Sequence, residues 1–253
     1  PLLAASCAQD TGGSVAATPP TAAAQGLDAA PWDLRTRNQA IKGGQTDNEH
    51  PQVVGIFSAA SGGICSGTLI APNLVLTAQH CVAEVPNSFV ICGSTRFGDI
   101  TDARSIFVTT DTQMSPRSRL FRATEVEVAP GPRDLCGADI AVLILADNVP
   151  ATVAEPATPR IDITAQAEEI YTAHGYGDDG SGGGFAAGLR RWITDRTVMC
   201  DGVDCVRLLG GQIRANEWVG SEGTCQGDSG GPAFDEQGRV FGVHAISLAA
   251  KEE

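Results

Sequence analysis

The sequence predicts an all-β protein, either a barrel or a sandwich of short strands. Only 19% of the residues are charged, 5% are aromatic and 30 are glycines, a composition that suits strands and loops better than a helical bundle. From about residue 52 onward, short β-like runs are separated by Gly, Pro, Asn and Asp. With 253 residues the chain can bury a large core, as one large domain or two small ones.

The expected strands are apolar and β-branched runs bounded by turn residues. They cover residues 53–58, 64–70, 73–78, 88–92, 104–109, 123–129, 140–145, 169–174, 190–198 and 239–246. Residues 146–160 are rich in proline and weakly patterned, which is typical of a connection between two β units. The glycine-rich stretch 177–184 is most simply a surface loop.

Residues 1–40 differ in composition from the rest of the chain. Within them, residues 8–31 have too few large apolar side chains to offset the entropy cost of ordering, so they indicate a linker or pro-segment. Residues 2–7 are similar to the end of a bacterial secretory signal. Two interpretations of Cys7 stay open: a lipid-anchored cysteine after a lipoprotein cleavage box, or an incidental cysteine in a signal tail.

Charge and cysteine content indicate the compartment. The net charge of -13 argues against nucleic acid and anionic membrane surfaces as partners, since both demand basic patches. The eight cysteines do not form CxxC pairs followed by histidines, so disulfides in an oxidising compartment explain them better than a zinc site. We expect a secreted or cell-envelope protein, in the periplasm or on the outer-membrane surface.

The string GTCQGDSGGP at residues 223–232 is the strongest sign of chemistry. A serine nucleophile needs a tight turn with backbone N–H groups aimed at the developing oxyanion. Gly227 and the pair Gly230 and Gly231 allow such an approach because they have no Cβ. A glycine-rich turn alone indicates only a hairpin loop, but the aspartate beside Ser229 makes the full string far more specific.

Two further segments supply the partners that such a serine needs. His80, in LTAQHC, follows a strand-like run and is a candidate general base. Asp139, in CGADIAVLIL, is a candidate for a buried carboxylate that orients an imidazole. The default interpretation of the remaining histidines is structural, and they are His50, His174 and His244.

Together, in the order His, Asp, Ser, these segments resemble the trypsin-like serine proteases, of the bacterial secreted type. The resemblance covers residues 41–247. It implies two antiparallel, six-stranded Greek-key barrels of the chymotrypsin-like fold, over 41–150 and 151–253, which form one peptidase domain. The second barrel is expected to be incomplete at the C-terminus.

The resemblance also implies the roles of individual residues. His80, Asp139 and Ser229 would be the catalytic triad, with the backbone N–H groups of Gly227 and Ser229 as the oxyanion hole. IKGG, which begins at Ile41, resembles the start of the mature chain in this family, with lysine in place of the usual valine.

Two further expectations follow from the family. In the family, an activating protease cuts before this isoleucine, here after Ala40, and the freed amino group of Ile41 would pair with Asp228. Gly223, at the base of the substrate pocket where trypsin-like members carry Asp, implies a non-basic residue before the scissile bond, with medium apolar side chains preferred. The aligned pocket wall includes Ala245 and Ser247.

Disulfide pairs are expected as well. Cys65 and Cys81 flank a strand pair and would fix the loop that presents His80. Cys200 with Cys205 is expected as a local staple, and a third pair would join Cys92 and Cys136. Cys225 has no assigned partner.

The predicted function is a serine endopeptidase, made as a zymogen, that acts on protein or peptide substrates without a metal or organic cofactor. Asp99 and Asp102 are alternatives for a Ca²⁺ site, but solvated loop charges are the simpler interpretation. Two other hypotheses stay open. One is a non-catalytic protease homologue that acts as a binding module, favoured by the changes at 245–247, and the other is an inactive truncated fragment.

Overall fold

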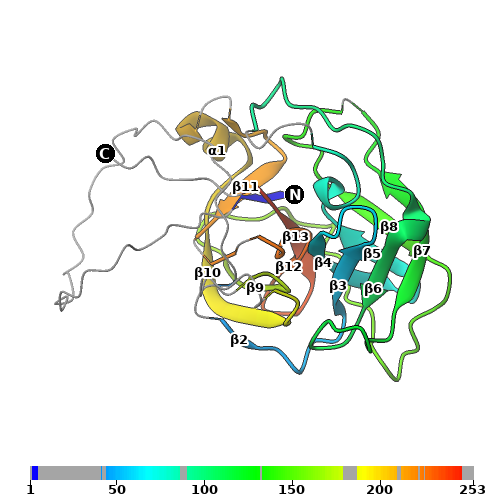
Figure 1. Ribbon diagram of the computed structural model, residues 1–253. Coiled ribbons are helices and arrows are strands. Elements are labelled where there is room, and N and C mark those ends of the chain that lie inside the picture. Colours follow the sequence, from blue (N-terminus) through cyan, green and yellow to red (C-terminus); the bar gives the residue numbers. More distant parts are fainter. Residues whose placement is uncertain are drawn as a thin grey trace, which may run out of the picture.

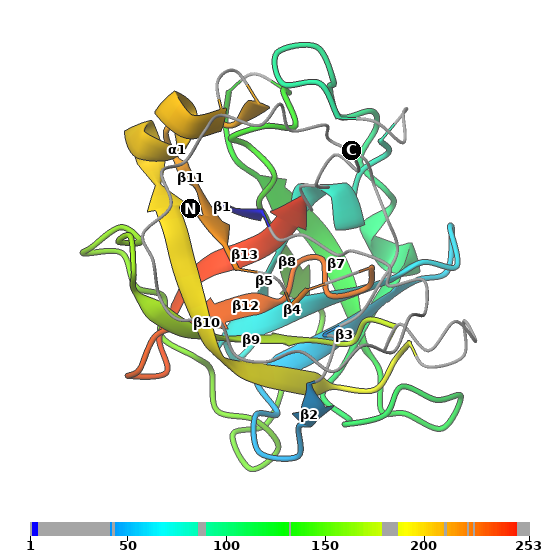
Figure 2. The same cartoon turned by 90° about the vertical axis from the view of Figure 1, so that its left-hand side faces the viewer.

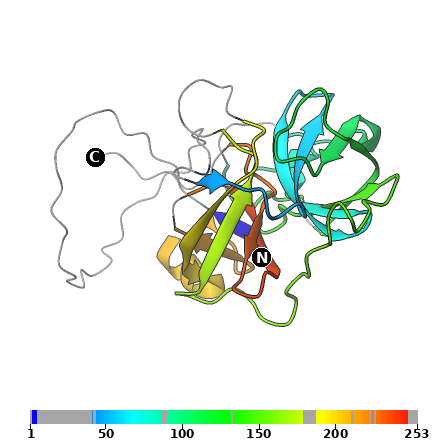
Figure 3. The same cartoon turned by 90° about the horizontal axis from the view of Figure 1, so that it is seen from below.

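The structure is a computed structural model that describes most of the chain from residue 44 onward. The described residues are 2–4, 41, 44–85, 90–131, 133–178, 187–209, 212–221, 223–224 and 226–246. Two β units lie side by side, one formed by the strands of the first half and the other mainly by those of the second half (Figure 1; Figure 3).

The first unit is a closed antiparallel barrel in the order β3-β4-β5-β8-β7-β6. Its strands are β3 (Val53–Ser58), β4 (Ile64–Ala71), β5 (Leu74–Thr77), β6 (Ile106–Thr109), β7 (Phe121–Val128) and β8 (Ala141–Leu145). Alternate residues of β8 are buried, as expected for a strand with one face on the core. These side chains, Leu143 among them, form the barrel core with Ile56 and Val75.

The second unit is a seven-stranded sheet in the order β11-β1-β13-β12-β9-β10-β2, and β10 also pairs with β11. Its strands are β1 (Leu2–Ala4), β2 (Gln45–Thr46), β9 (Ile170–Gly175), β10 (Arg191–Asp201), β11 (Glu217–Gly220), β12 (Pro232–Phe234) and β13 (Val240–Ile246). Its core is aromatic: Trp218 packs edge-on to Tyr171 and tilted against Phe241. The two units together confirm the chymotrypsin-like fold class.

Strand β1 stands between β11 and β13 and runs parallel to both (Figure 2). Since β10 pairs with β11, this strand completes a ring of pairings in the second unit. The expected incompleteness of the second barrel concerned its C-terminal end. Residues 247–253 lie outside the described residues, so this expectation stays a prediction.

Helices are short and few in the described part of the chain. The α-helix α1 (Gly202–Leu209) follows β10, and two 3-10 helices, η1 (Gln79–Cys81) and η2 (Ala103–Ser105), lie in loops of the first unit. None of these helices is long and apolar enough to cross a membrane.

Most predicted strands are present, with ends shifted by up to three residues. The expected strand at 88–92 is wrong over its described part, because the N–H groups of Ser94 and Thr95 donate to the Ile91 carbonyl in a turn. Strands β11 and β12 are short and carry little pattern, and the sequence did not predict them. Nor did it predict that β2 belongs to the second sheet, where it pairs with β10.

The three expected disulfides are present in the described residues. Cys65 pairs with Cys81, and Cys92 with Cys136, both in the first unit. The third, Cys200 with Cys205, staples the end of β10 to α1. The other two cysteines of the sequence analysis, Cys7 and Cys225, lie outside the described residues.

Candidate active site

His80 and Asp139 are held together at the end of the first barrel. His80 lies in η1, directly after β5, and Asp139 precedes β8, which pairs with β5. One carboxylate oxygen of Asp139 accepts a hydrogen bond from the His80 backbone N–H at 2.8 Å, and the other lies 2.6 Å from Nδ1 of the ring. Asp139 is fully buried, so this carboxylate sets both the position and the tautomer of the imidazole.

The neighbouring carboxylate also changes the protonation of His80. Burial of the ring acts to lower its pKa, but the negative charge and the hydrogen bond of Asp139 outweigh this and raise the pKa of His80 above 6.5. The His80 side chain keeps 22% of its surface exposed. Its ring can therefore exchange a proton with a bound molecule.

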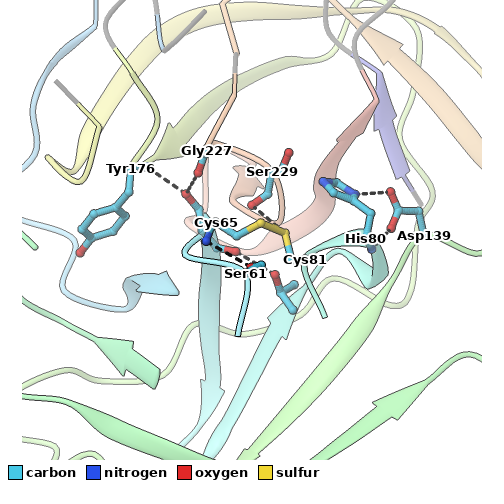
Figure 4. Close-up of a disulfide and its surroundings, with 11 residues drawn as sticks. Ser61, Cys65, His80, Cys81, Asp139, Tyr176, Gly227 and Ser229 are labelled. Carbon is cyan, nitrogen blue, oxygen red and sulfur yellow. Dashed lines mark hydrogen bonds and ion pairs between the residues drawn. A yellow bond between two sulfur atoms is a disulfide. The ribbon is translucent and has the colours of Figure 1, made fainter. Parts of the chain in front are cut away.

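Ser229 lies on the side of the His80 ring opposite to Asp139 (Figure 4). Its carbonyl accepts a hydrogen bond from the Ser66 N–H at 2.7 Å, which ties the serine turn to β4 of the first barrel. The next residue, Gly230, donates its N–H to the His244 carbonyl of β13 at 2.7 Å. The turn is thus held by both β units.

Two glycines make this turn possible. Gly227 and Gly230 have φ values of +93° and +82°, in the left-handed region that glycine adopts without strain. A Cβ on Gly230 would lie 2.1 Å from the Thr77 hydroxyl oxygen and 2.2 Å from the Ser66 carbonyl oxygen. Only glycine fits at position 230.

Ser66 is a residue of this site that the sequence analysis missed. Its buried hydroxyl donates to the Gly227 carbonyl at 2.7 Å and accepts from the Tyr176 N–H at 2.8 Å. Because its own N–H binds the Ser229 carbonyl, Ser66 holds the chain on both sides of Asp228. A serine inside an apolar strand carries no local signal of such a contact.

The Cys65–Cys81 disulfide lies against the same turn (Figure 4). It joins the strand that carries Ser66 to the residue after His80, and Cys81 Sγ lies 3.5 Å from the Ser229 carbonyl oxygen. The expectation that this pair fixes the loop carrying His80 agrees with this position.

Asp228 and Ile41 are both buried. One carboxylate oxygen of Asp228 accepts a hydrogen bond from the Gly177 N–H at 2.8 Å. The Ile41 carbonyl accepts the Gly44 N–H. A Cβ on Gly175 would lie 2.2 Å from the Asp228 carboxylate, so the end of β9 packs directly on this aspartate.

The structure describes two of the three predicted pocket residues, Gly223 and Ala245. Gly223 has a φ of +146°, and its Cβ position would lie 3.2 Å from Cδ of Arg196 on β10. Ala245 lies on β13 and is half-buried. Ser247 lies outside the described residues.

A second polar cluster joins the segment after Ile41 to the second sheet. The Asp47 carboxylate lies 2.9 Å from Nδ1 of His50 and 2.8 Å from Nδ1 of His174. The buried Arg190 side chain donates to the Asp47 carbonyl. Burial acts to raise the pKa of Asp47, but the hydrogen bonds from both histidines outweigh it and hold this pKa far below its usual range.

This cluster has a triad-like composition, since Nε2 of His174 lies 3.2 Å from the Thr172 hydroxyl. Thr172, however, lies within strand β9, without a glycine turn beside it. Asp47, His50 and His174 could also offer three ligand atoms within 4.8 Å of one another. Both carboxylate oxygens of Asp47 already accept N–H groups, so we assign the cluster a structural role, as expected for these histidines.

Among the described residues, neither Asp99 nor Asp102 belongs to a group of three or more side chains that could hold a metal ion. Asp102 caps η2, where its carboxylate accepts the Arg104 N–H at 3.0 Å. The backbone carbonyl of Asp99 accepts the Glu84 N–H. Asp102 therefore has the role of a local cap.

A buried carboxylate, a histidine and a serine turn at the junction of two β units define a chymotrypsin-fold serine protease. Comparison with known families agrees: residues 41–253 match the family model described as Trypsin. The chain therefore belongs to the trypsin family.

Individual relatives are bacterial and animal proteases. The chain is 29% identical over 202 residues to "Trypsin" of Saccharopolyspora erythraea, covering 76% of this chain and 80% of the relative. It is 29% identical over 245 residues to "Trypsin-like protease" of Streptomyces glaucescens, covering 92% and 78%. It is 27% identical over 191 residues to "Brachyurin" of Leptuca pugilator, covering 74% and 76%.

Proposed function

We propose that this protein is a serine endopeptidase whose catalytic triad is His80, Asp139 and Ser229. The observation that carries the proposal is the pair of hydrogen bonds between Asp139 and His80, with Ser229 on the free side of the ring. This is the geometry that a general base needs, because one ring nitrogen is committed to the carboxylate and the other faces the nucleophile.

The reaction follows from these positions. Ser229 Oγ attacks the carbonyl carbon of the scissile peptide, while Nε2 of His80 takes the hydroxyl proton. Asp139 stabilises the imidazolium that forms. His80 then gives the proton to the leaving amine, and an acyl-enzyme on Ser229 remains. A water molecule, activated by the same histidine, releases the acyl group and restores the enzyme.

The oxyanion that forms during attack needs donors that are already in place. We assign this role to the backbone N–H groups of Gly227 and Ser229. Ser66 supports the assignment, because its hydrogen bonds to the Gly227 and Ser229 carbonyls hold the backbone of the turn that carries both N–H groups.

Activation by cleavage before Ile41 is part of the proposal. Asp228 is buried beside the nucleophile, and a freed amino group of Ile41 would give this carboxylate a charged partner. Asp47 anchors the segment after Ile41 to His174 of the second sheet, so only the few residues before this anchor would have to move. The protease that makes the cut stays unidentified.

The location is proposed to be outside the cytoplasm, in the cell envelope or secreted. Three disulfides among the described residues favour an oxidising compartment. A lipid anchor at Cys7 stays a prediction.

A fluorophosphonate probe tests the catalytic assignment, because it reacts with an activated serine whatever the substrate preference. The protein cut before Ile41 should be labelled, and Ser229→Ala should not be. Ser221→Ala, which removes a serine outside the proposed triad, should be labelled like the wild type. A cut wild-type protein that folds but takes up no label would contradict the enzyme and favour a non-catalytic homologue.

A further inference from the structure

His244 is a buried histidine next to the nucleophile, and the mechanism above does not use it. Only 3% of its surface is exposed, and neither ring nitrogen has a hydrogen-bond partner within the described part of the chain. A buried polar group without a partner destabilises the folded protein. Such a group commonly marks a place where a ligand completes the hydrogen bonds.

The strand that carries His244 is tied to the serine turn from both sides. The His244 N–H donates to the Gly231 carbonyl at 2.9 Å, and its carbonyl accepts the Gly230 N–H at 2.7 Å. Two residues earlier on β13, the Cβ position of Gly242 faces the Trp218 ring at 2.7 Å. Residues two apart on a strand share a face, so the His244 ring points into the interior of the second sheet, next to Ser229.

Arg196 lies near the predicted base of the pocket, where its half-exposed side chain donates from Nε to the Thr194 carbonyl at 3.0 Å. It lies on β10 opposite Tyr171, which packs on Trp218. The Cβ position of Gly223 lies 3.2 Å from Cδ of Arg196 and 3.8 Å from Nη1 of its guanidinium. Position 223, at the predicted base of the pocket, therefore carries no carboxylate and has an arginine beside it.

From these positions we propose that the pocket beside Ser229 binds an acidic substrate side chain, so that the enzyme cleaves after glutamate or aspartate. The substrate carboxylate would accept a hydrogen bond from His244 and lie in the field of Arg196. The proposal rests on the proposed peptidase function, and it replaces the expected preference for medium apolar residues. A basic side chain would be repelled by Arg196, and an apolar one would leave the His244 ring without a partner.

The protonation of His244 fits this role. Burial, with a smaller contribution from His174, lowers the pKa of His244 to about 3, although a contact with the Pro232 backbone outside hydrogen-bond geometry acts to raise it, so the imidazole is neutral at pH 7. A neutral ring donates one N–H and adds no buried positive charge to the site. A carboxylate that enters the site brings the missing acceptor.

A substrate series tests the proposal. The protein cut before Ile41 is given peptides that differ only in the residue before the scissile bond: Glu, Asp, Gln, Leu or Arg. Since a hydrogen bond to a charged group contributes roughly 10- to 100-fold in affinity, kcat/KM for Glu or Asp should exceed that for Gln by at least about tenfold. Equal or faster cleavage after Gln, Leu or Arg overturns the proposal.

Variants of Arg196 and His244 test which side chains cause the preference for acidic substrates. Arg196→Gln and His244→Val should each lower the Glu-to-Gln ratio of kcat/KM by about tenfold or more, while cleavage after Leu stays within about threefold. Arg207→Gln, an exposed arginine of α1 that pairs with Asp204, is the matched control and should leave the ratio unchanged. If His244→Val does not fold, the substrate series and Arg196→Gln still decide. An unchanged ratio in Arg196→Gln removes that residue from the site.

Failure of this proposal is distinct from failure of the enzyme. The fluorophosphonate probe has no side chain for the pocket, so labelling of Ser229 without acidic preference refutes only the pocket assignment. Absence of labelling in the cut, folded protein refutes the catalytic function itself.

Discussion

Replacing Ser66 with alanine separates the support of the active site from its chemistry. The hydroxyl is buried, donates to the Gly227 carbonyl at 2.7 Å and accepts from the Tyr176 N–H at 2.8 Å. Ser66→Ala leaves both groups buried without this partner. At about 1–3 kcal/mol for each unsatisfied group, and with some relaxation, we expect the free energy of unfolding to fall by about 2–4 kcal/mol.

The same substitution should slow catalysis in the protein that remains folded. Gly227 supplies a proposed oxyanion donor. Without the hydrogen bond from Ser66, the backbone dihedral angles of this glycine are less restricted, so its N–H is held less firmly. Loss of a whole oxyanion donor costs about 10²–10³-fold in kcat, so a loosened one should cost about 10- to 100-fold, with KM within about threefold. Urea unfolding measures the first effect, and steady-state kinetics at a temperature where the variant is folded measures the second.

Thr68 offers a matched control on the same strand, two residues from Ser66. It is equally buried, but its hydroxyl has no hydrogen-bond partner in the described residues. Thr68→Val should therefore leave kcat unchanged and the stability equal or higher. If Ser66→Ala kept the wild-type kcat while losing stability, Ser66 would be purely structural. If it lost neither, the reasoning from its hydrogen bonds would be wrong.

Three further predictions concern the triad, the turn and the second cluster. Asp139→Asn should lower kcat by about 10²–10⁴-fold. Because catalysis needs neutral His80 and Asp139 raises its pKa, the acid limb of kcat/KM against pH should lie above 6.5 in the wild type and move to lower pH in the variant. Gly230→Ala should strongly lower Tm, since its Cβ would meet Thr77 and Ser66, whereas Gly238→Ala, with φ +72° and open space around it, should cost only about 1–2 kcal/mol. Asp47→Asn should lower the free energy of unfolding at pH 7 by about 3 kcal/mol in urea, because it leaves Arg190 buried without a carboxylate.

The stability effect of Asp47 also has a definite pH dependence. Its folded-state pKa lies below the ordinary 3.8, so its contribution is complete above that value and is lost as the pH falls below it. Wild type and Asp47→Asn should therefore converge in acid, and an equal gap at all pH values would contradict this. For the other two, an unmoved acid limb in Asp139→Asn, or similar Tm losses in the two glycine variants, would be the refuting results.

Much of the first barrel was predictable from the sequence. Its strands are continuous apolar runs between turn residues, so the local pattern is enough to place runs such as Val53–Ser58. The strands that were missed carry little pattern: β12 has three residues and begins with proline. The turn at Ile91 was mistaken for a strand because apolar residues there serve a small cluster with Leu135 and not a sheet.

The candidate triad could also be found from the sequence, because each member sits in a short string of specific composition. The residues around it could not. The Ser66–Gly227 hydrogen bond joins positions 161 residues apart, and nothing near Ser66 in the chain marks it. The same is true of Asp47 and His174, which are 127 residues apart.

The sequence by itself determined the family, the strings that carry His80, Asp139 and Ser229, and the disulfide partners in the described residues. These depend on local composition and on spacing along one chain. Only the tertiary structure decided which buried polar groups have partners. It brought Ser66 to the serine turn, set Arg196 beside Gly223 and left the His244 ring without an acceptor. The reason is physical: the cost of an unpaired buried group depends on neighbours that only folding brings together.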